Sequence, residues 1–127
     1  MKYALLQDGL RYWRQQDPQR TALVLDDIER LSYEELGRWS DGIAEELQRP
    51  GVKPGDNVGI TGANSLPWLP AAYGALKAGA TLVPYNDRFV KDEFEYLLQV
   101  TEPRIVIADT PRATLLQSLA TPPALLA

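Results

Sequence analysis

The sequence contains no cysteine and no histidine. Disulfides, thiol nucleophiles, imidazole bases and zinc sites built on Cys or His are therefore excluded for this chain. Any catalysis by these residues would have to use carboxylates, Lys, Arg, Tyr or hydroxyl groups. This double absence is the strongest restriction that the sequence places on function.

Long apolar runs and clusters of basic residues are missing as well. No stretch approaches the roughly 18 apolar residues of a transmembrane helix, and Asp8 interrupts the first apolar segment, so no secretory leader is predicted. The 13 Lys and Arg residues are scattered, and 17 Asp and Glu bring the net charge to −4. Nucleic-acid binding is therefore not expected, and we expect a cytoplasmic protein.

What remains is an ordinary globular composition, with 45% hydrophobic and 24% charged residues in a chain of 127. This predicts one structural domain with one core. Within residues 1–56, the apolar spacing predicts a helix over residues 3–16 and a β-hairpin from strands at 21–25 and 30–33. Ser32 followed by Glu35 is a capping-box arrangement, which predicts a second helix before the Pro- and Gly-rich loop at 50–56.

Residues 57–120 alternate between apolar strands and helices. Strands are predicted at 57–61, 80–84 and 104–108, and helices at 66–78, at 91–100 and from Pro111 onward. This order predicts a βαβαβ unit with a parallel sheet, so the fold class is α/β. Residues 121–127, in which Pro122-Pro123 precedes Ala-Leu-Leu-Ala, are interpreted as a truncated tail.

The loop after the first parallel strand reads Thr61-Gly62-Ala63-Asn64-Ser65 and resembles the opening of the short-chain dehydrogenase fingerprint. Leu66 and Trp68 stand where that fingerprint has glycines that admit the pyrophosphate, so this function is disfavoured. Instead, Asn64 or Ser65 is the expected N-cap of the next helix. Pro70 is expected to disturb the first turn of that helix.

Four other stretches agree with one family in order and spacing. Residues 31–36 (LSYEEL) have the form of the first core motif of the adenylate-forming superfamily, Leu-(Thr/Ser)-Tyr-x-Glu-Leu, and residues 76–84 (LKAGATLVP) have the form of the second. Residues 51–58 and 64–67 resemble the stretches between these motifs. Residues 17–110 thus resemble the N-terminal part of acyl-CoA synthetases, luciferase-like ligases and peptide-synthetase adenylation domains.

The resemblance implies an ATP-dependent acid–thiol ligase that forms an acyl-adenylate, with ATP, Mg²⁺ and coenzyme A as cofactors of the parent enzyme. In this family both core motifs are framework, so no catalytic, cofactor-binding or metal-binding residue is assigned to this chain. The Ser/Thr/Gly-rich loop ending in Pro-Lys-Gly, which would clamp the triphosphate, is not in the sequence. We therefore expect a partial N-terminal subdomain that is inactive alone and binds the remainder of its parent ligase.

Two further expectations concern the kind of ligase and an alternative to it. Asn86 stands where peptide-synthetase domains prefer an Asp, which favours acyl- or aryl-CoA ligases. The alternative is a stand-alone, non-catalytic α/β module that binds or assembles with a partner. A subdomain separated from its parent should expose an apolar face and form homodimers or aggregates, whereas an evolved module should be monodisperse.

Overall fold

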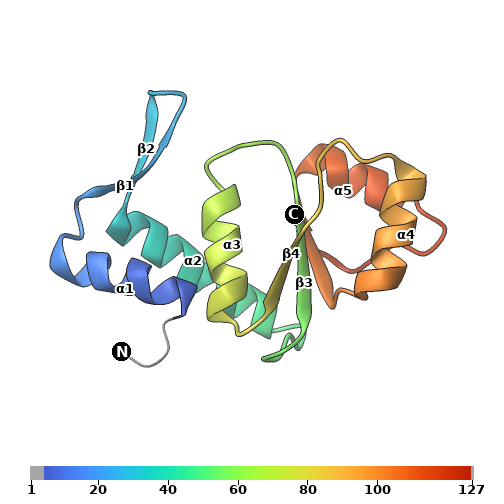
Figure 1. Ribbon diagram of the computed structural model, residues 1–127, viewed down its shortest axis with the longest axis horizontal. Coiled ribbons are helices and arrows are strands. Elements are labelled where there is room, and N and C mark those ends of the chain that lie inside the picture. Colours follow the sequence, from blue (N-terminus) through green and yellow to red (C-terminus); the bar gives the residue numbers. More distant parts are fainter. Residues whose placement is uncertain (1–4, 127) are drawn as a thin grey trace.

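The computed structural model describes residues 5–126 (Figure 1). The elements follow one another as α1 (Leu6–Gln16), β1 (Thr21–Leu25), β2 (Glu29–Ser32), α2 (Tyr33–Gln48), β3 (Asn57–Thr61), α3 (Trp68–Lys77), β4 (Thr81–Pro84), α4 (Lys91–Thr101), β5 (Ile105–Ala108), α5 (Thr110–Gln117) and β6 (Leu125–Leu126). No helix among these residues is long and apolar enough to cross a membrane.

The predicted hairpin is present, and it projects away from the body of the molecule (Figure 1). Strands β1 and β2 pair antiparallel, and Ile28 N donates to Leu25 O at 3.1 Å across the turn. Asp26 and Asp27 at the turn both have positive φ, at 53° and 58°. Two left-handed residues in succession are the signature of a type I′ turn, whose twist matches that of the paired strands.

Helix α2 begins where the sequence predicts it. The Ser32 hydroxyl accepts a hydrogen bond from Glu35 N at 3.1 Å, which is one half of the expected capping box. Leu36 and Leu47 are buried on the inner face of the helix. Gly74 lets α3 pack closely against α2, because a Cβ on this glycine would lie 2.5 Å from Cγ2 of Ile43.

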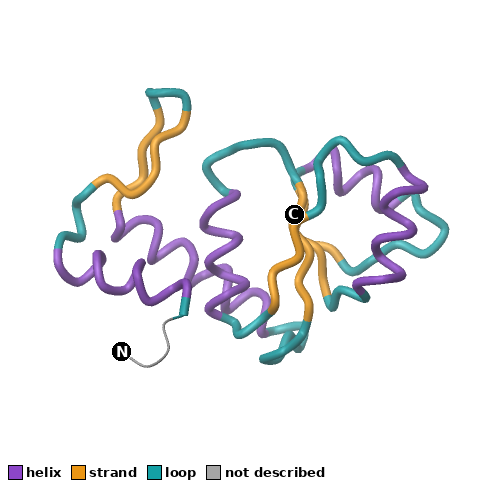
Figure 2. Tube along the Cα trace, in the orientation of Figure 1, coloured by secondary structure: helices purple, strands orange, loops and turns teal. Residues whose placement is uncertain are grey.

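The predicted parallel sheet has the strand order β4-β3-β5-β6. Helices α2 and α3 lie on one face of it, and α4 and α5 on the other (Figures 1 and 2). The first face packs around Val58 and Ile105, and the second around Val106 and Phe94. The fold is therefore α/β, with an antiparallel hairpin followed by a parallel sheet.

The fourth strand of this sheet comes from the segment that the sequence suggested is a tail. Val106 N donates to Ala124 O at 2.9 Å, and Leu125 and Leu126 pair parallel with β5. Leu125 also packs against the cluster beneath α4 and α5. Residues 125–126 therefore extend the predicted βαβαβ unit by one more strand.

The start of α3 differs from the prediction. The N-cap is Pro67, without a side-chain hydrogen bond, and neither Asn64 nor Ser65 caps the helix. Leu66 precedes a proline, which disfavours helical backbone there, so the helix begins only after Pro67. Pro70 is then the third residue of α3, where a backbone N–H would have no partner within the helix, and it does not disturb the turn.

Candidate functional site

A groove of about 620 Å³ opens at the carboxyl ends of β3 and β5, beside helix α2. In open parallel sheets, ligands bind outside the carboxyl ends of the strands, and this volume is typical of a ligand pocket. One wall comes from α2, with side chains Arg38, Trp39, Ile43 and Glu46 and the backbone of Gly42. The loop after β3 and the start of α3 form the opposite wall, and Ile60, Ile107 and Leu126 contribute the sheet side.

The groove is mostly apolar and aromatic. Trp39 is 38% exposed, and Trp68 lines the groove from the first turn of α3. Ile60 is buried beneath them and packs with Ala71 and Ala72. Such a lining suits an apolar or aromatic surface better than a polyphosphate.

A hydrogen-bond network around Asp109 joins the three loops at this edge of the sheet. Asp109 follows β5 and caps α5, and its Oδ2 accepts from Ala63 N and from Arg112 Nη1, both at 3.0 Å. Arg112 Nη2 donates to Asp87 Oδ2 at 3.1 Å, in the loop after β4. The Ala63 N–H and the Asp109 carboxylate are therefore already engaged within the protein.

Thr61, the last residue of β3, has a buried hydroxyl for which the described residues provide no hydrogen-bond partner. Thr61 is only 2% exposed, and it lines the groove together with the adjacent residues Ile60 and Gly62. A buried hydroxyl without a partner costs free energy, because its hydration is lost and not replaced.

A second hollow, of about 300 Å³, lies among α1, α2 and α3 and is lined by charged groups that are paired with each other. Arg14 Nε donates to Glu34 Oε2 at 3.0 Å and Arg14 Nη1 to Asp41 Oδ2 at 2.8 Å. Lys77 Nζ donates to Asp41 Oδ1 at 2.7 Å. These bonds join three helices and leave Asp41 with two cationic partners.

The ion pairs shift the ionisation of the groups that make them. The hydrogen bond from Arg14 holds the pKa of Glu34 below its usual value. Burial raises the pKa of Asp41, but the hydrogen bonds from Lys77 and Arg14 outweigh it and leave that pKa lowered. The hydrogen bonds to Glu34 and Asp41 in turn raise the pKa of Arg14.

The structure places the two matched motifs away from the groove. Residues 31–36 form the end of β2 and the start of α2, and residues 76–84 form the end of α3 and all of β4. The motifs do not line the groove; Lys77 instead donates to the Gly37 carbonyl at 3.1 Å, next to the first motif. The expectation that this chain contains no catalytic, cofactor-binding or metal-binding residue stays a prediction.

The sequence drew attention to one segment of the groove, the loop at residues 61–65, but did not predict the groove as a site. The lining residues come from four separate segments, within residues 38–46, 60–71 and 107–110 and at Leu126, and include ordinary apolar side chains. The sequence feature that could have indicated the groove is the position of two polar residues. Thr61 and Asp109 each stand at or just after the carboxyl end of a predicted parallel strand. Polar residues at this edge are brought together by the sheet.

Comparison with known sequences gives a consistent result. Residues 10–125 match the family model described as AMP-binding enzyme. The chain is 35% identical over 89 residues to a fatty acid–[acyl-carrier-protein] ligase, ScoC, of Streptomyces coeruleorubidus, and the match covers 70% of this chain and 17% of that protein. It is 34% identical over 90 residues to tyrocidine synthase 1 of Brevibacillus parabrevis, a match that covers 71% of this chain and 8% of that protein.

Solved structures share the fold over nearly the whole chain. A nonribosomal peptide synthetase, FmoA3, superposes with a TM-score of 0.87 at 28% identity, covering 98% of this chain and 13% of that one. The N-terminal domain of FACL13 from Mycobacterium tuberculosis superposes with a TM-score of 0.85 at 27% identity, covering 95% of this chain and 32% of that one. The chain therefore spans a minor part of each of these four proteins.

Proposed function

The chain belongs to the AMP-binding enzyme family, and from this membership we propose that it serves as the N-terminal subdomain of an ATP-dependent acid–thiol ligase. The observation that supports this most strongly is the family match over residues 10–125, together with the fold shared with the N-terminal domain of FACL13. The whole ligase would join a carboxylic acid to ATP as an acyl-adenylate, release pyrophosphate, and pass the acyl group to a thiol.

The residues of this chain do not suit the triphosphate of ATP. The Ala63 N–H is bonded to Asp109, and Pro67 and Pro70 remove donors from the start of α3. The groove is lined by Trp and Ile side chains, whereas phosphate sites converge several N–H groups and a cation. We therefore propose that the remainder of the ligase binds ATP, Mg²⁺ and the thiol, and that this chain supplies framework.

The relatives do not agree on which carboxylic acid is activated or on which thiol accepts the acyl group. These include a fatty acid ligase that uses an acyl carrier protein, a medium/long-chain fatty acid–CoA ligase and a nonribosomal peptide synthetase. Asn86, which favoured acyl- or aryl-CoA ligases, accepts a hydrogen bond from Arg88 N at 2.9 Å and so has a local role in the turn after β4. The preference for acyl- over aminoacyl-ligases stays a prediction.

ATP–pyrophosphate exchange tests whether this chain acts alone. We expect no exchange above background when the 127-residue chain is assayed with fatty, aryl and amino acids, because charge stabilisation and positioning of the phosphates supply most of the rate. Exchange by the isolated chain with any of these acids would overturn the proposal that it is inactive without a partner.

A chimera tests whether the chain is a ligase framework. Residues 17–110 replace the matched segment of ScoC, and we expect acyl-adenylate formation within about a hundredfold of the unmodified ligase. A chimera with a disrupted framework, in which buried Leu36 is also changed to Asp, serves as the control and should be inactive. A folded chimera without adenylation would favour the alternative, a non-catalytic binding module.

A further inference from the structure

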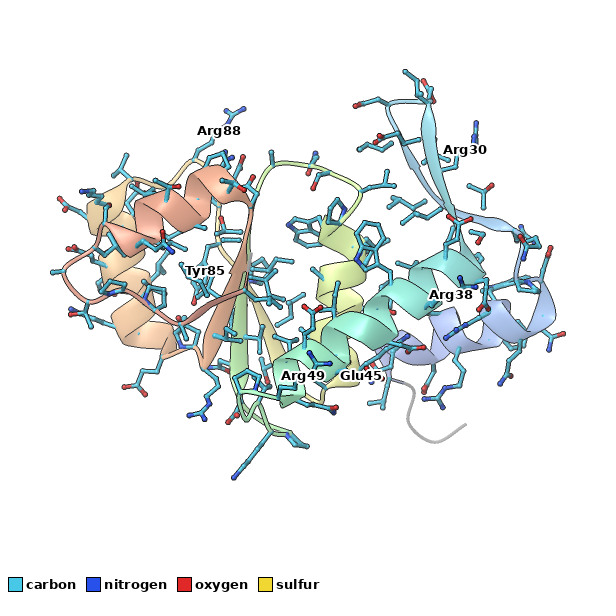
Figure 3. All side chains as sticks on the ribbon, turned by 180° about the vertical axis from the view of Figure 1, so that it is seen from behind. Arg30, Arg38, Glu45, Arg49, Tyr85 and Arg88 are labelled. Atoms are coloured by element: carbon cyan, nitrogen blue, oxygen red, sulfur yellow. The ribbon has the colours of Figure 1, made fainter. Side chains whose placement is uncertain are left out.

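Helix α2 carries an exposed row of residues whose charges are arranged about one glycine. The row consists of Glu35, Arg38, Gly42 and Glu46 of α2 and of Arg49, the C-cap residue, which keeps helical backbone angles. All five are exposed, at offsets of −7, −4, 0, +4 and +7 from Gly42. At 100° per residue, these positions fall within an arc of about 80° on one side of the helix. Figure 3 labels Arg38 and Arg49 toward opposite ends of α2.

The order of the signs in this row is acidic, basic, glycine, acidic, basic. If a second copy of α2 runs antiparallel with Gly42 at a two-fold axis, Arg38 lies opposite Glu46 of the second copy. Glu35 then lies opposite Arg49 of the second copy, so every charge in the row meets its opposite. A parallel pairing in the same register would instead place like charges together, which is unfavourable.

The surface beside the row can receive another helix. No heavy atom lies within 4 Å of the position that a Cβ on Gly42 would occupy, so this glycine permits close approach of a second backbone. The apolar groove runs along the same side of α2, since Arg38, Gly42 and Glu46 are also part of its wall. Trp39, which is 38% exposed, projects from the same helix and would bury its ring on association.

The winding of the sheet explains why this surface is open. The connections from β4 to β5 and from β5 to β6 step in one direction along the sheet and carry α4 and α5. Right-handed crossovers that step in one direction lie on one face, which here is the face opposite α2 (Figure 1). Among the described residues, this face is therefore covered by α2 and α3 alone, and Ile107 and Leu126, which pack against the cluster beneath these helices, stay half-buried at the side of the groove.

The present partner of Arg38 would not prevent a new contact. Its guanidinium lies 3.6 Å from Glu34, and its side chain is 74% exposed. Exposed ion pairs of this kind contribute little to stability. Arg38 can therefore turn toward a second copy at small cost.

We propose that the protein forms a two-fold homodimer through antiparallel α2 helices, with Gly42 at the axis and the grooves beside α2 covered by the second copy. Such a contact is isologous, because the same surface is used by both copies. It goes beyond the ligase function, since it assigns a partner and a surface to the chain itself.

Sedimentation equilibrium of the full chain at low salt tests the proposal. We compare the wild type with Arg38→Glu, with Glu46→Arg and with the double variant Arg38→Glu/Glu46→Arg. Each single variant places like charges opposite each other twice, so the dimer dissociation constant should rise at least about tenfold. The double variant restores opposite charges and should return to within about threefold of the wild type.

A matched control is Tyr96→Glu, which adds a charge at a residue that is 66% exposed on α4, on the other face of the sheet. It should leave the dissociation constant unchanged, and circular dichroism should show that all four variants are folded. A wild type that stays monomeric up to about 1 mM would overturn the proposal. So would a double variant that associates as weakly as the single ones, or a control that weakens association as much as they do.

Discussion

Lys77 joins two helices through atoms that the sequence does not place together. It lies at the end of α3, and its Nζ reaches the Gly37 carbonyl and the Asp41 carboxylate on α2. A cation in the last turn of a helix also suits the helix dipole. These contacts hold the end of α3 against α2, whose first turn contains the other matched motif.

The buried hydroxyl of Thr61 gives a prediction with an unusual sign. Thr61→Val replaces the unpartnered hydroxyl by a methyl group of similar shape and should raise the free energy of unfolding by up to about 1 kcal/mol. Urea denaturation of the variant and the wild type provides the measurement.

The control for this prediction is Thr101→Val. The Thr101 hydroxyl donates to Leu97 O at 2.7 Å and is 2.6 Å from Tyr85 Oη, so its removal should lower the free energy of unfolding by about 1–2 kcal/mol. If both variants lose the same stability, the Thr61 hydroxyl has a partner and its assignment as unsatisfied is wrong.

Replacing Gly74 or Gly9 by alanine gives a second pair of variants with opposite expected effects on stability. In Gly74→Ala the new Cβ would lie 2.5 Å from Ile43 Cγ2 and 3.1 Å from Ser40 O, so α2 and α3 must separate. The free energy of unfolding should fall by about 1–3 kcal/mol, as for other overpacked sites.

In Gly9→Ala no atom lies within 4 Å of the new Cβ, and alanine favours the helical conformation of α1 more than glycine does. Its free energy of unfolding should rise by about 0.5–1 kcal/mol. Thermal denaturation of the two variants measures the difference, and equal effects would show that the α2–α3 contact is looser than the distances indicate.

At the scale of elements, the strands were the most predictable part. The apolar runs at residues 57–61 and 104–108 appear as β3 and β5 with boundaries within one residue. The two-residue strand β6 was missed because its pattern is too short to distinguish from a tail, and its pairing depends on β5 being adjacent. The groove was missed because its lining residues, such as Trp39 and Leu126, are far apart in the sequence and are brought to one groove only by tertiary packing.

The ion pairs that link α1 and α2 predict a pH dependence. The pKa values of Glu34 and Asp41 are held below their ordinary values of 4.5 and 3.8 in the folded state. Their contribution to stability is therefore present above these ordinary values and is lost as the pH falls through the lower folded ones. The free energy of unfolding should decrease on acidification from about pH 6 to about pH 3.

Arg14→Met tests the origin of this dependence. The variant loses the hydrogen bonds to both carboxylates, so it should be less stable than the wild type at pH 6 and should lose less on acidification. Urea midpoints at the two pH values give the comparison. Parallel pH profiles for the two proteins would show that other carboxylates cause the acid sensitivity.

At the scale of the whole molecule, cooperativity should differ between the hairpin and the sheet. Strand β3 pairs on both sides, with β4 and β5, and its residues Val58 and Ile60 are buried. The hairpin projects from the body, and its tip residue Ile28 is 82% exposed. Amides of β3 should therefore exchange with deuterium at least about a hundredfold more slowly than those of residues 21–32. Hydrogen-exchange mass spectrometry measures this ratio, and equal protection would mean that the hairpin unfolds only with the core.

The proline that ends β4 affects how readily the chain aggregates at high protein concentration. Thr81 and Tyr85 donate their N–H groups to the β3 side, so Leu82 and Pro84 turn their nitrogens toward the open edge, and Pro84 has no hydrogen to offer. This edge of the sheet is thus a poor template for strand addition, so growth into fibrils through β4 is disfavoured.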